Sequence, residues 1–140
     1  MYLCVVLHHP LIQTYMQSYL VKTYNQPTKR YCQTLELKNE PALIAEYERL
    51  HSPEHSWQEI RDGIREVGIL EMEIYRFENK LFMIVETPQD FDWDSAMARL
   101  ATLPRQEEWE NTVAAFQQCA QGATSDEKWH GMHRIFYLYD

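Results

Sequence analysis

The chain is an acidic, moderately apolar sequence of 140 residues, a length that fits one domain. Hydrophobic residues make up 45% of it, which is too many for a disordered protein. Lys and Arg number 13 and Asp and Glu number 21, and the resulting net charge of −8 argues against nucleic acid and anionic membranes as partners. No stretch approaches the roughly 20 apolar residues that a transmembrane helix needs.

The three cysteines indicate a reducing compartment. Cys4, Cys32 and Cys119 are scattered and form no C-x-x-C motif, so neither a disulfide framework nor a zinc knuckle is predicted. The apolar stretch 2–7 is short, lacks a basic leader and is interrupted by His8, which argues against a signal peptide. We therefore expect a cytoplasmic protein.

Residues 1–28 differ from the rest of the chain. Their apolar side chains recur with the period of a helix until a polar stretch ends the pattern, and the stripe consists of Leu11, Ile12, Tyr15, Met16, Tyr19 and Leu20. We expect an N-terminal extension here, either an added helix that packs on the domain or sequence upstream of its true start. The domain itself is expected over residues 29–140.

The first half of the domain is predicted to contain a strand and two helices. Residues 30–38 alternate between two faces, as a strand does. Asn39 as N-cap and Pro41 at an early position predict a helix that continues until a Ser-Pro pair breaks it. A second helix is expected over 57–67, where the apolar residues fall on one side, and Gly68 suits the position just after its end.

The second half is predicted to contain three strands and two helices. Strands at 69–77 and 81–87 flank a hairpin loop, in which Asn79 is expected to tolerate the left-handed conformation. The other expected elements are helices at 94–103 and 104–119, a loop at 121–128 and a last strand at 132–139, whose alternation is imperfect.

This order of elements is the split βαβ, or ferredoxin-like βαββαβ, arrangement. It predicts an α+β fold with a four-stranded antiparallel sheet and helices on one face. The central strand at 81–85 is continuously apolar, which is typical of a strand covered on both faces. Since the helices cover one face, we expect a second subunit to cover the other.

Tyr47 and His51 are the first candidates for chemistry. They lie four residues apart, so a helix places both side chains on one face about 5–6 Å apart. The C-terminus of a helix favours the protonated form of a histidine, and a His beside a Tyr can act as an acid–base pair. The alternatives are a packed His that stabilises the helix end, or a metal ligand together with His55, for which the sequence places no third ligand.

A tryptophan among carboxylates is the second candidate. Glu107, Glu108 and Glu110 flank Trp109 near the start of a predicted helix. Aromatic faces stack on the C–H faces of sugars and carboxylates bind sugar hydroxyls, so the pattern is compatible with sugar binding. The alternative is that the carboxylates complement the helix dipole while Trp109 packs in the core. The sequence contains no Gly-rich phosphate loop, Walker motif, H-E-x-x-H or G-x-S-x-G.

Taken together, these segments resemble the L-rhamnose mutarotase family, including its branch associated with L-fucose. The resemblance covers about residues 29–139 and rests on short motifs in the family's order: Lys29-Arg30-Tyr31-Cys32, Glu46-Tyr47-Glu48-Arg49-Leu50-His51, Glu71-Met72-Glu73-Ile74-Tyr75, Leu81-Phe82-Met83-Ile84-Val85-Glu86, Glu107-Glu108-Trp109-Glu110 and Glu127-Lys128-Trp129. It implies a homodimeric α/β barrel. It also implies an isomerase that interconverts the α and β anomers of a 6-deoxy-L-hexose, a monosaccharide, without a cofactor or metal.

The resemblance also implies site residues. The family's acid–base histidine falls on His51 and its helix tyrosine on Tyr47, while sugar-contacting positions fall on Met72, Glu108 and Trp109. The rhamnose-type pattern has Tyr in place of Met72 and Trp in place of Glu108, and both changes fit the L-fucose branch. Mutarotation removes a proton from the anomeric hydroxyl and delivers one to the ring oxygen, which groups with a pKa near neutrality can do.

Two other functions are also compatible with the sequence. Dimeric ferredoxin-like barrels include haem-binding and cofactor-free monooxygenases, in which His51 would be an axial ligand. A dimer of the same fold could instead bind a small molecule without catalysis. The segment 52–56 after His51 is longer than the family pattern, which would alter the edge of a pocket there.

Overall fold

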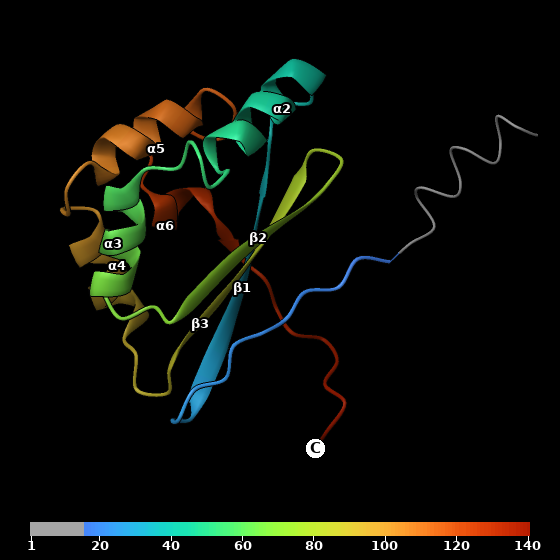
Figure 1. Ribbon diagram of the computed structural model, residues 1–140, viewed down its shortest axis with the longest axis vertical. Coiled ribbons are helices and arrows are strands. Elements are labelled where there is room, and N and C mark those ends of the chain that lie inside the picture. Colours follow the sequence, from blue (N-terminus) through green and yellow to red (C-terminus); the bar gives the residue numbers. More distant parts are fainter. Residues whose placement is uncertain (1–15) are drawn as a thin grey trace, which may run out of the picture.

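The computed structural model describes residues 16–140, which form a sheet and a layer of helices on one of its faces (Figure 1). The strands are β1 (Thr28–Glu36), β2 (Glu71–Phe77), β3 (Lys80–Pro88) and β4 (His130–Gly131). The helices are α2 (Pro41–Leu50), α3 (Gln58–Glu66), α4 (Trp93–Leu100), α5 (Gln106–Ala114) and α6 (Ser125–Lys128). Within this part of the chain, no helix is long and apolar enough to cross a membrane.

The four strands are antiparallel and lie in the order β2-β3-β1-β4. Because helices connect β1 to β2 and β3 to β4, this is the predicted ferredoxin-like βαββαβ arrangement, and the α+β fold class is confirmed. Leu35 pairs with Leu81, and Met72 pairs with Val85. Directly paired residues share a face of the sheet, and these four lie on the face toward the helices.

The core lies between this face and the helical layer. Leu35, Leu81 and Val85 are almost fully buried and alternate along their strands with residues that are more exposed, as predicted for a sheet with helices on one face. Helix α5 adds Trp109 and Val113 to the same cluster. Each such side chain contributes about 1.5–3 kcal/mol by its burial. This packing fixes α2 and α5 over the sheet, where the site lies.

Two turns show where a left-handed backbone is needed. Gly68 has a φ of +103° just after α3, as expected of a residue that ends a helix. In the hairpin between β2 and β3, Glu78 and not Asn79 takes the positive φ, which is 54°. Asn79 instead exchanges two hydrogen bonds with Leu37, from the Leu37 amide to its carbonyl (2.7 Å) and from its side-chain amide to the Leu37 carbonyl (3.0 Å). These bonds hold the hairpin against the end of β1.

The helix boundaries differ from the predicted ones by a few residues. Helix α2 starts at Pro41 as expected, but Glu40 is its N-cap instead of Asn39, and no side chain caps it. The predicted loop at 121–128 contains the short helix α6. A capping box starts that helix, in which Thr124 and Glu127 bond to each other's backbone amides. The T-x-x-E pattern that signals such a box is present in the sequence.

The predicted strand at 132–139 is wrong. The structure has a two-residue strand there, β4 (His130–Gly131), followed by one further hydrogen bond from the Met132 amide to the Cys32 carbonyl (2.8 Å). Beyond that bond the chain leaves the sheet and is exposed (Figure 1).

Two features of the sequence explain why β4 stops. Continuing its register on β1 would place Arg134 directly opposite Arg30, and like charges in such a pair destabilise a sheet. The run 135–139 is also apolar at every position and so has no polar face to turn to solvent. In the structure these side chains are exposed, Ile135 by 91%.

The N-terminal extension contains no helix in its described part. Residues 11–15 of the predicted helical stripe lie outside the described residues, and the rest of the stripe has no regular structure. The extended segment contacts the sheet face that the helices leave uncovered, where the rings of Tyr19 and Tyr75 are 5.6 Å apart. The hydroxyl of Tyr24 donates to the carbonyl of Leu70 (3.0 Å). The division of the chain at residue 28 stays a prediction, since β1 runs across it.

Candidate active site

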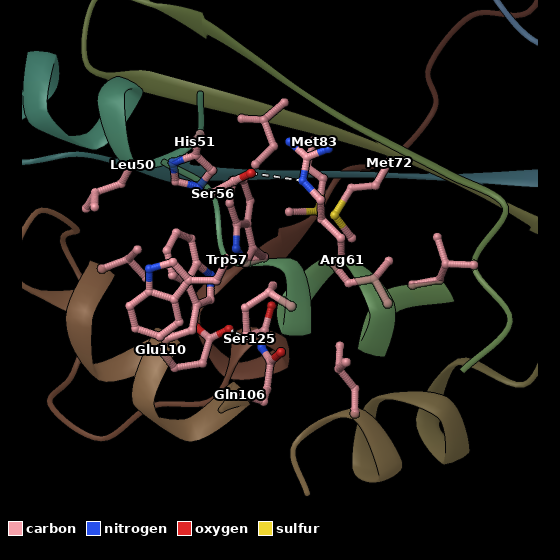
Figure 2. A pocket seen from close by; sticks show the side chains of 18 of the residues that line it. Leu50, His51, Ser56, Trp57, Arg61, Met72, Met83, Gln106, Glu110 and Ser125 are labelled. Atoms are coloured by element: carbon pink, nitrogen blue, oxygen red, sulfur yellow. Dashed lines mark hydrogen bonds between the residues drawn. The ribbon is translucent and has the colours of Figure 1, made fainter. Parts of the chain in front are cut away.

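A cavity of about 420 Å³ lies between the helices and the sheet. Its walls come from α2, α3, α5, β2 and β3, and four of the five predicted site residues line it. Figure 2 shows His51 and Trp57 on one side of this space and Met72 and Met83 on the other. The helices and the loop between α2 and α3 therefore supply the aromatic and most of the polar groups, while the sheet supplies mainly apolar side chains.

His51 is the residue that ends α2, and its ring is fixed by a hydrogen bond. Nδ1 lies 2.7 Å from the carbonyl oxygen of Tyr47. A carbonyl can only accept, so Nδ1 carries the proton and Nε2 is the nitrogen left to accept one. Burial lowers the pKa of His51 from its usual 6.5, against the opposing effect of the bond to Tyr47. The neutral form is thus favoured near pH 7, whereas the helix terminus alone would favour the protonated one.

Tyr47 lies one turn earlier on α2 and packs against His51. Their ring centroids are 4.3 Å apart, and Tyr47 is 3% exposed. The Tyr47 hydroxyl accepts a hydrogen bond from Nε2 of Gln117 (3.2 Å). Burial is the main cause of a strongly raised pKa, so the phenol keeps its proton at neutral pH. It can therefore donate a hydrogen bond into the cavity but does not act as a base.

Trp109 completes an aromatic wall around His51. The centroid of its ring lies 5.2 Å from that of His51 and 5.1 Å from that of Trp57, both in edge-to-face contact. The Arg105 guanidinium stacks on the outer face of Trp57 at 3.9 Å from its centroid. Edge-to-face contacts of this kind favour one orientation of each ring. The wall therefore holds His51 in place with little freedom to rotate.

Met72 lies on β2 with its side chain toward the helices, because it pairs with Val85, a core residue. It lines the cavity together with Ile74 and Met83. These three side chains offer no strong hydrogen-bonding group, so they can contact the apolar part of a ligand.

Glu108 lies outside this cavity, unlike the other four predicted residues. Its side chain is 58% exposed, and its two carboxylate oxygens accept hydrogen bonds from Arg105 at 3.0 and 3.1 Å. The bond to Arg105 lowers the pKa of Glu108. In this arrangement, the carboxylate holds the arginine that stacks on Trp57.

A different carboxylate on α5, that of Glu110, faces the cavity. Its Oε1 accepts from Nζ of Lys128 (2.9 Å) and its Oε2 from Nε2 of Gln106 (2.6 Å). Lys128 also donates to the Glu110 carbonyl (2.7 Å), and its side chain is 0% exposed. The sequence interpretation missed this buried network of three residues. The signal was available, since Gln106, Trp109, Glu110 and Val113 follow the i, i+3, i+4, i+7 spacing of one helix face.

The described residues contain no group of three or more His, Cys, Asp or Glu side chains placed to hold a metal ion. The Nδ1 of His55 lies 3.1 Å from the Ser52 hydroxyl, at an exposed position. What residues 16–140 do bring together is a partly buried imidazole with one free nitrogen, a protonated phenol and a wall of aromatic rings. Such a set can remove a proton and return it on a small polar ligand.

The fold is of the α+β ferredoxin-like class, and its cavity has in its wall a histidine with one nitrogen available to accept a proton. The profile of the family described as L-rhamnose mutarotase matches residues 30–138, and the chain belongs to this family. The resemblance found in the sequence is thereby confirmed, and with it the class of enzyme, an isomerase. Membership favours this class over the haem-binding, monooxygenase and non-enzymatic alternatives.

Individual relatives agree with the family. An L-fucose mutarotase of Xanthomonas campestris pv. campestris is 38% identical over 79% of this chain and 88% of its own length. A UPF0734 protein of Dictyostelium discoideum is 35% identical over 64% of this chain and 71% of its own length.

Two solved structures share the fold at low sequence identity. An L-rhamnose mutarotase of Formosa agariphila superposes with a TM-score of 0.59 at 18% identity, covering 79% of this chain and 99% of its own. The tetracenomycin F2 cyclase of Streptomyces glaucescens, a polyketide cyclase, superposes with a TM-score of 0.52 at 15% identity, covering 80% and 97%.

Proposed function

We propose that this protein is a mutarotase that interconverts the α and β anomers of a 6-deoxy-L-hexose, with L-fucose as its substrate. The family match supports the reaction, and the 38% identity to an L-fucose mutarotase supports L-fucose over L-rhamnose as the sugar. The observation that carries the proposal is His51, a partly buried residue of the cavity wall whose Nδ1 is bonded to a carbonyl and whose other ring nitrogen is free to accept a proton.

His51 is the acid–base group in this proposal. As a neutral imidazole, it takes the proton of the anomeric hydroxyl at Nε2. The C1–O5 bond then breaks as protonated His51 gives its proton to the ring oxygen, and the sugar opens to its aldehyde form with the imidazole neutral again. Rotation about the C1–C2 bond presents the other face of the aldehyde, and the reverse proton transfers close the ring as the other anomer.

The remaining residues bind and orient the sugar. Tyr47 donates a hydrogen bond from a hydroxyl that stays protonated. Trp109 offers an aromatic surface beside His51. Met72 contacts an apolar part such as the C6 methyl group, which distinguishes 6-deoxy sugars from ordinary hexoses. The resemblance assigns Glu108 a sugar contact as well, and since this carboxylate is bonded to Arg105, that contact would require it to turn inward.

The proposal predicts that His51→Ala loses nearly all acceleration of anomer exchange, by about 10²–10⁴-fold, the usual contribution of general acid–base catalysis. The measurement is saturation-transfer NMR between the anomeric protons of L-fucose and, separately, L-rhamnose. Spontaneous exchange without protein sets the baseline. His55→Ala is the matched control, because His55 is exposed and bonded to Ser52. Exchange by His51→Ala at the wild-type rate would contradict the role given to His51.

We further propose a homodimer in the cytoplasm. Tyr75 and Phe82 pair on the sheet face that the helices leave uncovered, and a second copy packed on that face would bury them. Exposed apolar residues after β4, such as Ile135, would also become buried in the dimer. Free thiols on Cys32 and Cys119 are compatible with a reducing compartment. Sedimentation of the full chain tests the dimer, and a monomer at micromolar concentration would contradict it.

A further inference from the structure

Gln117 has no role in the scheme above, yet it lines the cavity and is 2% exposed. It follows α5 in the chain, and its backbone forms an isolated antiparallel bridge with Leu37 just beyond β1. Two further backbone hydrogen bonds hold this segment: the Gln118 amide donates to the Glu36 carbonyl (2.8 Å), and the Gln117 amide donates to the Ala114 carbonyl (3.2 Å). The backbone is thus held on the sheet, and the side chain is fixed in the cavity wall.

Only one of the two polar atoms of the Gln117 carboxamide has a hydrogen-bond partner among residues 16–140. Its Nε2 donates to the Tyr47 hydroxyl (3.2 Å). Its Oε1 is buried and, among residues 16–140, has no hydrogen-bond partner. Buried polar side chains are almost always paired, since leaving one unpaired is costly, so an unpaired one calls for a specific explanation. Gln117 lines the cavity, so a rotation of its carboxamide that turns this oxygen toward the cavity would give it a ligand as its partner.

Tyr47 supplies the complement to this unpaired oxygen. Its hydroxyl accepts the bond from Gln117 and keeps its own proton, which it can donate. The pair therefore offers one free donor, on Tyr47, beside one free acceptor, on Gln117. A sugar hydroxyl is both a donor and an acceptor, so a single hydroxyl can satisfy both atoms at once.

We propose that Gln117 is a substrate-binding and specificity-determining residue, whose Oε1 accepts a hydrogen bond from one sugar hydroxyl while that hydroxyl accepts one from Tyr47. The inference rests on the proposed mutarotase function and adds a contact to it. It gives a partner to the one oxygen of Gln117 that has none among residues 16–140.

The test is a comparison of deoxy sugars between wild type and Gln117→Met. Anomer exchange is measured by saturation-transfer NMR on L-fucose and on analogues that each lack one ring hydroxyl. For the wild type, removing one particular hydroxyl should lower the exchange rate by about tenfold or more, because the amide is then left unpaired. For Gln117→Met, the parent sugar should itself be slowed by about tenfold, while loss of that hydroxyl should cost almost nothing more.

Gln118→Met is the matched control. Gln118 is exposed and its side chain bonds to the Leu37 carbonyl (2.9 Å), away from the cavity. It should keep the wild-type ranking of the analogues. Gln117→Met removes a buried unpaired oxygen but also the hydrogen bond to the buried Tyr47 hydroxyl, so the ranking of the analogues, and not the urea midpoint, is the readout that separates the two roles. A purely structural glutamine would leave the deoxy ranking preserved, whatever the midpoint.

The outcomes separate this inference from the proposed function. If the wild type accelerates exchange and Gln117→Met keeps the same ranking of analogues, Gln117 does not bind a sugar hydroxyl. That result contradicts this inference and leaves the proposed mutarotase function intact. The same holds if no deoxy analogue is slower than the parent sugar with the wild type, a result that needs no folded variant. If the wild type accelerates exchange of no sugar, the mutarotase function itself falls.

Discussion

Helix α5 carries two glutamates that are two residues apart and lie in opposite surroundings. Glu108 faces solvent and bonds to Arg105, whose side chain is 39% exposed. Glu110 faces the cavity and bonds to Lys128, whose side chain is 0% exposed. Both contacts are carboxylate–cation pairs at about the same distance, 3.0 and 2.9 Å. What differs is the water around them, and this difference decides what each pair contributes.

In water, an ion pair adds little to the free energy of unfolding, because solvent screens the attraction and both charges are also well solvated in the unfolded chain. In a buried wall, the two charges have lost their hydration and depend on each other. The outer pair therefore serves to hold Arg105 over Trp57. The inner pair, with Gln106, keeps a charged carboxylate fixed beside the cavity.

The largest effect expected from this comparison follows from removing one partner of the inner pair. Lys128→Met leaves the Glu110 carboxylate buried with Gln106 as its remaining side-chain donor, and the free energy of unfolding should fall by about 3–5 kcal/mol. Urea denaturation followed by circular dichroism measures it. The double variant Lys128→Met/Glu110→Gln should recover part of the loss, because it removes the uncompensated charge. If Lys128→Met unfolds at the wild-type midpoint, the inner pair is not buried in the way described.

A smaller effect concerns His51, whose pKa burial lowers below 6.5. In the pH range between that lowered pKa and 6.5, the unfolded chain binds more protons at this position than the folded chain. Stability from this group is therefore fully present above pH 6.5 and is lost as the pH falls toward the folded-state pKa. Catalysis should follow the same titration, since protonation removes the base, so the acid limb of the exchange rate should lie below pH 6.5.

His51→Gln provides the comparison for this titration. The wild-type urea midpoint should fall between about pH 7 and pH 5 by more than that of His51→Gln, which has no imidazole to protonate. An acid limb of the exchange rate centred above 6.5 would mean that His51 is stabilised in its charged form, contrary to the effect of burial.

The sequence could predict the fold because the signals that define it are local and periodic. Alternation along β1, the continuous apolar run in β3, and the Pro41 and Gly68 boundaries were all readable before the structure. The absence of a full strand at 132–139 could not be predicted in this way. It depends on a cross-strand pair, Arg30 with Arg134, that no local pattern of the sequence shows. Element type follows from neighbours in sequence, whereas element length also depends on the partner strand.

The residues of the candidate site also divide into those that local spacing predicts and those that it does not. Tyr47 and His51 share a helix face by spacing alone, so their proximity was predictable. Gln117 reaches the cavity and Lys128 reaches Glu110 from segments after α5, and sequence spacing does not predict contacts between segments so far apart in the chain. The acidic cluster is an intermediate case, because its three glutamates look equivalent in sequence. The helical period separates Glu110 from Glu108, provided that the start of α5 is known.

The smallest effect is expected for the outer glutamate, and it tests the sequence expectation directly. With Glu108 bonded to exposed Arg105, Glu108→Gln should leave the urea midpoint nearly unchanged and should alter the KM for L-fucose by less than about twofold. Glu110→Gln, two residues along the same helix, should change both quantities, since it disrupts the buried pair. A large rise in KM for Glu108→Gln with an unchanged midpoint would mean that Glu108 turns inward when the sugar binds. In that case the solvent-facing side of α5 would belong to the binding site, and the contrast between the two glutamates would hold for the ligand-free protein alone.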